Sequence, residues 1–96
     1  MLVELSITPL TGNSHISDEI AGILDIIDEA DVPYQLTPAG TCLEDEWDEV
    51  MPVIRQCHEQ AREYAPHVIT ALKIEDEDGA ANQLEENISS VEEKLA

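Results

Sequence analysis

Alternation of hydrophobic and polar residues predicts β-strands at four places along the chain. The first, residues 2–8, puts aliphatic residues on one face and polar residues on the other. Residues 34–37 and 40–44 are short strands on either side of a turn at Pro38-Ala39-Gly40, so we expect them to pair as an antiparallel hairpin. The fourth strand is expected at residues 67–74.

Hydrophobic residues that recur at three- and four-residue steps predict three helices. Ser17 is a suitable N-cap for the first helix, whose apolar stripe consists of Ile16, Ile20, Ile23, Leu24 and Ile27. The second runs from Glu46 to Tyr64, and its stripe consists of Trp47, Val50, Ile54, Cys57, Ala61 and Tyr64. The third carries a stripe made of Leu84, Ile88, Val91 and Leu95.

The order of these elements predicts an α+β fold, a ferredoxin-like βαββαβ sandwich with an additional C-terminal helix. Residues 1–96 are then a single domain, because a chain of this length is too short for two. We expect the first two helices to cover the apolar face of the sheet. The opposite face is expected to stay open and to display polar side chains, namely Glu4, Ser6, Thr8, Gln35, Thr37, Thr41 and Lys73.

The net charge of the chain limits the classes of partner that it is expected to bind. It carries 22 acidic residues against four basic ones, for a formal net charge of -18, and the acids are spread evenly along the sequence. Such a surface is typical of halophilic proteins, because screening over only ~3 Å at molar salt removes the repulsion between acids. A halophilic protein is the favoured interpretation, and an ordinary acidic protein of a mesophile is the alternative. The scarcity of cations argues against binding to nucleic acids or to anionic membranes, which need basic patches.

Metal chemistry and catalysis find little support in the sequence. Cys42 and Cys57 lack a CxxC spacing and no secretory signal is apparent, so we expect reduced, buried cysteines in a cytoplasmic protein. A zinc site fails on ligand spacing, and the acidic loop around Gly79 does not fit a calcium-binding loop. No nucleophile–base pair or glycine-rich phosphate loop is evident, so the chain is not expected to be an enzyme.

The sequence resembles the thiamine-binding YkoF-like family. The resemblance rests mainly on the block from Tyr34 to Thr41, with further fragments around Ser6-Ile7-Thr8-Pro9, His58-Glu59 and Lys73-Ile74. It spans nearly the whole chain and implies a ferredoxin-like domain that assembles into homodimers or homotetramers. The implied ligand is thiamine or its hydroxymethylpyrimidine moiety, with no cofactor besides that ligand.

This resemblance implies that the polar sheet face binds a ligand and is more than a solvent-exposed surface. Hydroxyl and amide groups can donate and accept hydrogen bonds, as the edge of an aminopyrimidine requires. The predicted ligand-binding residues are Ser6, Gln35, Thr37, Thr41, Glu44, His58 and Lys73. The alternative is that this polar face contacts water or a partner sheet, in an oligomeric interaction or regulatory module without a ligand of its own.

Four side chains are candidates for more specific roles. Glu4 or Glu44 is a candidate to neutralise a cationic thiazolium ring, and Trp47 to stack on it, although core packing is the favoured role for Trp47. His58 either points into a pocket at the helix–sheet edge or is a hydrogen-bonded structural residue.

Overall fold

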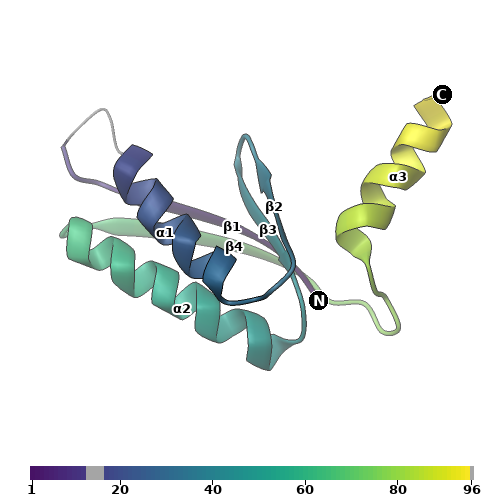
Figure 1. Cartoon of the computed structure of the whole chain (residues 1–96), viewed down its shortest axis with the longest axis horizontal. Helices are drawn as coiled ribbons and strands as arrows, with labels where there is room; N and C mark the ends of the chain where they lie inside the picture. The colour runs from purple at the N-terminus through teal and green to yellow at the C-terminus, as the bar shows by residue number, and fades with distance from the viewer. Residues whose placement is uncertain (13–16, 96) are drawn as a thin grey trace.

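A computed structural model describes residues 1–12 and 17–95 of the chain. Helices and strands follow the predicted order and nearly the predicted bounds (Figure 1). The elements are β1 (Leu2–Pro9), α1 (Ser17–Glu29), β2 (Tyr34–Thr37), β3 (Gly40–Glu44), α2 (Trp47–Tyr64), β4 (Val68–Glu75) and α3 (Gln83–Leu95). Ile16, assigned to the stripe of the first helix, lies outside the described residues.

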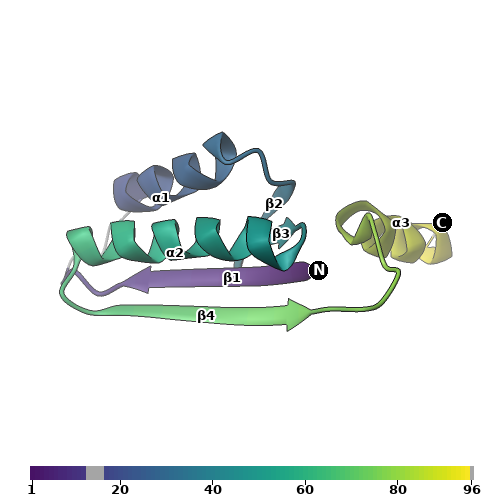
Figure 2. The same ribbon diagram turned by 90° about the horizontal axis from the view of Figure 1, so that it is seen from below.

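The four strands form one antiparallel sheet in the order β2-β3-β1-β4. β1 pairs with β4 along the whole length of both strands, from Leu2 opposite Glu75 to Pro9 opposite Val68. Helices α1 and α2 lie side by side on one face of this sheet (Figure 2). The arrangement is the predicted ferredoxin-like α+β fold, which is confirmed.

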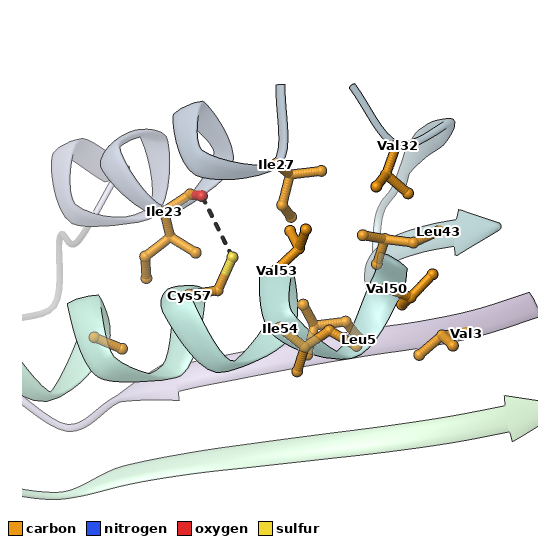
Figure 3. Close-up of a cluster of buried hydrophobic side chains, with 11 residues drawn as sticks. Val3, Leu5, Ile23, Ile27, Val32, Leu43, Val50, Val53, Ile54 and Cys57 are labelled. Carbon is orange, nitrogen blue, oxygen red and sulfur yellow. Dashed lines mark hydrogen bonds between the residues drawn. The ribbon is translucent and has the colours of Figure 1, made fainter. Parts of the chain in front are cut away.

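An aliphatic core holds α1 and α2 on the sheet (Figure 3). Val3 and Leu5 of β1 meet Leu43 of β3 on the helix-covered face, where α2 contributes Val50 and Ile54. Because the chain has no Phe and only three aromatic residues, burial of Val, Leu and Ile side chains supplies most of the hydrophobic stabilisation.

The predicted stripe of α2 is right in its middle and wrong at its ends. Trp47 is 54% exposed and Tyr64 is exposed too, so core packing of Trp47 is a prediction that the structure contradicts. Both residues stand at the ends of α2, whereas the buried cluster takes up only its middle, from Val50 to Ala61. Val53, which the stripe omitted, is buried against the core.

Helix α3 stands apart from the other two helices (Figure 1). It packs on β3 alone among the main element contacts. Its predicted apolar stripe is largely exposed, with Val91 56% and Leu95 80% accessible to solvent. Within residues 1–12 and 17–95, no helix is long and apolar enough to cross a membrane.

Candidate functional site

The sheet register divides the predicted ligand-binding residues between the two faces. Residues directly opposite on neighbouring strands share a face, and Thr41 pairs with both Leu5 and Leu36. Thr41 therefore lies on the helix-covered face and is only 6% exposed. Its predicted place on the open face is wrong, because the two-residue turn aligns Thr37 with Gly40 and puts Thr41 beside Leu36.

A pocket of about 320 Å³ lies where the β2–β3 hairpin meets α1 and β1. We call it the hairpin pocket. Its walls are mostly aliphatic, and the polar side chains among them are hydroxyls. The lining residues are Leu5, Ser6, Ile7, Ile20, Ile23, Leu24, Ile27, Leu36, Thr37, Pro38, Ala39, Gly40 and Thr41. Three of the seven predicted ligand-binding residues, Ser6, Thr37 and Thr41, thus come together here.

The three hydroxyls of the hairpin pocket are not equivalent. Thr37 Oγ1 donates to the carbonyl oxygen of Gly40 at 3.0 Å and accepts from the amide of Ala39 at 3.3 Å, so it stabilises the turn. The side chains of Ser6 and Thr41 have no hydrogen bond to any other residue that the structure describes. The register puts Thr41 beside Leu5 on the helix-covered face, so its hydroxyl is available to a ligand in the pocket as donor and acceptor. Ser6 follows Leu5 along β1, so its side chain lies on the open face of the sheet.

Two local features hold the walls of this pocket in place. At Gly40 a Cβ would collide with the backbone carbonyl of Leu5, so glycine lets the hairpin approach β1 closely. At the other end of β2, the hydroxyl of Tyr34 donates to Asp28 Oδ1 at 2.8 Å and ties the hairpin to α1. The hydrogen bond to the Asp28 carboxylate raises the pKa of Tyr34, and desolvation and the negative charge of Asp28 act in the same direction.

Gln35 and Glu44 line a separate and more open hollow of about 650 Å³ between the sheet and the start of α3. The carboxylate of Glu44 accepts hydrogen bonds there from the backbone amides of Gln83 at 2.7 Å and Leu84 at 3.1 Å. Glu44 thus caps α3, which places its charge at the positive end of the helix dipole. The capping of α3 by Glu44 is observed, whereas its role in neutralising a ligand cation stays a prediction.

Lys73 lies on the open face, opposite Glu4 in the strand register. Together with Cys42 it lines a hollow of only about 60 Å³, too small for a vitamin-sized ligand. Partial burial and the nearby charge of Glu4 raise the pKa of the Cys42 thiol. The expectation of buried cysteines holds for Cys57, whereas Cys42 is only half-buried.

His58 is on the face of α2 that packs toward β4. Its Nδ1 lies 2.7 Å from Thr70 Oγ1, in a half-buried contact that joins the helix to the edge strand. His58 lines none of the hollows described above. The structure therefore gives it the second of its two predicted roles, that of a hydrogen-bonded structural residue.

The sequence analysis missed the contribution of α1 to the pocket. Ile20 and Leu24 were assigned to a core stripe, yet they are only half-buried and line the hairpin pocket. The one sequence feature that pointed to this part of the molecule is the hairpin turn at Pro38-Ala39, because these two residues also line the pocket. No cluster of three potential metal ligands occurs within residues 1–12 and 17–95.

Comparison with known proteins identifies relatives that match almost the whole chain. A family model described as thiamine-binding protein matches residues 3–92. A UPF0045 protein of Methanothermobacter thermautotrophicus is 32% identical over 95 residues, which cover 96% of each chain. The UPF0045 protein YqgV of Bacillus subtilis is 30% identical, and the match covers 98% of this chain and 96% of YqgV.

Solved structures share the fold. A hypothetical protein of Methanocaldococcus jannaschii superposes with a TM-score of 0.87 at 23% identity, covering 96% of this chain and 95% of its own. A Thermotoga maritima protein named for thiamine biosynthesis or salvage gives a TM-score of 0.83 at 20% identity, with coverage of 94% and 96%. At these identities the likeness establishes the ferredoxin-like fold.

Proposed function

The chain belongs to the thiamine-binding protein family, and on this premise we propose that it binds thiamine or its hydroxymethylpyrimidine moiety without catalysing a reaction. Its role would be vitamin salvage or carriage in the cytoplasm. A thiamine-related role is supported by the family match and by the name of the Thermotoga maritima structural neighbour. The two free cysteines are consistent with a reducing compartment.

The observation that carries the proposal is the composition of the hairpin pocket. Its aliphatic walls, formed by residues such as Ile20, Leu24 and Leu36, suit the faces of an aromatic ring. The unpartnered hydroxyl of Thr41 suits a ring nitrogen or the amino group of an aminopyrimidine. A volume of about 320 Å³ is within the range of small-molecule sites.

Isothermal titration calorimetry with thiamine and with hydroxymethylpyrimidine tests this proposal. In high-salt buffer we expect saturable binding of both ligands. The variant Thr41→Val removes the pocket hydroxyl and should weaken binding about five-fold, equivalent to ~1 kcal/mol for one lost hydrogen bond. Thiamine recovered unchanged by chromatography after long incubation would support binding without catalysis.

A matched control is available on the same face of the sheet. Thr70→Val removes a hydroxyl that contacts His58 outside the hairpin pocket, so it should lower stability and leave the dissociation constant unchanged. Absence of heat at millimolar ligand, with the protein folded by circular dichroism, would refute thiamine-related binding. Equal losses in Thr41→Val and Thr70→Val would contradict the assignment of the pocket.

A second candidate function is that of an oligomeric interaction module, a homodimer or homotetramer, for which β4 is the specific observation. It is an edge strand of eight residues, paired only with β1, and Ile69, Leu72 and Ile74 on it are exposed. Residues 64–74 contain no acid, so two copies could approach here with little repulsion. Light scattering of the wild type and of Leu72→Asp tests this: a monomer in both would refute it.

A further inference from the structure

None of the four Lys and Arg side chains of the chain lines the hairpin pocket. Arg55 forms an ion pair with Glu59 at 3.0 Å on the exposed surface of α2, and Arg62 donates to the carbonyl oxygen of Ala65 at 3.0 Å. Lys73 lies on the open face and Lys94 in the last turn of α3. None of these four side chains lines the hairpin pocket or the hollow beside α3.

Among residues 1–12 and 17–95, the first turns of the helices offer no substitute for these cations. Helix N-termini are the usual backbone sites for phosphate, because their free amides and the helix dipole attract anions. In this chain each helix carries two acids in its first turn, which repel an approaching anion. These acids are Asp18 and Glu19 in α1, Asp48 and Glu49 in α2, and Glu85 and Glu86 in α3.

The charge of the whole molecule acts in the same direction. A net charge of -18 on 96 residues makes the average potential around the molecule negative. This potential attracts the thiamine cation, leaves the neutral pyrimidine alcohol unaffected and repels phosphate esters. At molar salt the long-range part is screened, but the uncharged lining still offers nothing to replace the water lost by a phosphate.

We infer that the hairpin pocket accepts thiamine and its pyrimidine alcohol only in their unphosphorylated forms and rejects their phosphate esters. This inference rests on the proposed function and narrows its ligand class. The chain would then hold the vitamin before the phosphoryl-transfer reaction that produces the coenzyme form, and it would not compete for the coenzyme itself.

Titration of thiamine, thiamine diphosphate and hydroxymethylpyrimidine at two KCl concentrations tests the inference. The lower concentration is the lowest at which circular dichroism shows the chain folded, and the higher one is molar. Thiamine diphosphate should bind about tenfold more weakly than thiamine or worse at both, a factor equivalent to ~1.4 kcal/mol. Added KCl should weaken thiamine binding, strengthen diphosphate binding and leave the alcohol unchanged.

A charge placed at the pocket provides the converse test. Leu36 lines the pocket and is more than half exposed, so Leu36→Arg should fold and strengthen diphosphate binding, whereas Leu36→Gln should not. Equal or tighter binding of the diphosphate by the wild type would overturn the inference and leave the proposed function intact. Failure of all three ligands to bind would instead overturn the proposed function.

Discussion

Cys57 occupies the centre of the aliphatic core, where α1 and α2 meet (Figure 3). Its side chain is fully buried, and its thiol donates a weak hydrogen bond to the carbonyl oxygen of Ile23, with Sγ 3.7 Å from that oxygen. Burial raises the pKa of the Cys57 thiol to about 11, because a thiolate in the core would lose its hydration. Cys57 is thus a small packing residue with an unreactive thiol.

We predict that the free energy of unfolding falls between pH 9 and about 11 in a way that depends on Cys57. The folded chain keeps the proton to a higher pH than the unfolded chain, so this contribution is complete below pH 9 and is lost as the pH rises through about 11. Denaturant unfolding of wild type and Cys57→Ala at pH 8 and pH 10.5 would check this. An identical loss in both proteins would show that other groups cause it.

At the scale of elements, α2 and α3 have similar amphipathic patterns and opposite surroundings. The stripe of α2 packs on the sheet and is buried. The first turn of α3 contacts β3, whereas Ile88, Val91 and Leu95 of its stripe are exposed. An isolated helix of 13 residues is marginally stable in water. The cap from Glu44 is therefore an important stabilising contact of α3.

We predict that Glu44→Ala loosens α3 and leaves the rest of the fold intact. Loss of a helix cap costs about 1 kcal/mol, so amide hydrogen exchange in residues 83–95 should become about five-fold faster. Glu46→Ala is the matched control, because Glu46 lies two residues away and makes no side-chain cap to its own helix. Protection of α3 that is the same in all three proteins would contradict the capping role.

At the scale of the whole molecule, the surface charge is the dominant feature. Acids are spread over the sequence, and the structure contains one ion pair among its described residues, Arg55 with Glu59 on the exposed face of α2. Such an exposed pair contributes little to stability. The repulsion among the remaining acids is therefore opposed by hydrophobic burial and by dissolved salt.

We predict that the melting temperature rises with KCl into the molar range, as expected for a halophilic protein, because screening relieves this repulsion. Thermal unfolding followed by circular dichroism measures it directly. A variant with exposed, unpaired acids of α1 and α2 replaced, such as Asp25→Asn with Glu63→Gln, should show a smaller rise. A melting temperature that is flat or falls with added salt would contradict the halophilic interpretation.

The candidate site was predicted less completely than the fold. Ser6, Thr37 and Thr41 all border the hairpin pocket, but the register puts Thr41 on the helix-covered face and Ser6 and Thr37 on the open face. The prediction failed at the turn, because a shift of one residue in strand register moves a side chain to the other face. Glu44 and His58 were predicted as ligand-binding residues, but their observed hydrogen-bond partners, α3 and Thr70, are distant in sequence.

Sequence alone determined the elements, their order and the fold, because periodicity, turn residues and helix signals are local properties of the chain. It also determined the net charge and the small number of Lys and Arg side chains that could bind a phosphate. Only the tertiary structure decided where polar side chains meet, which helix lines the pocket and that the stripe of α3 is left exposed. These depend on register and on packing between distant segments, which no local pattern specifies.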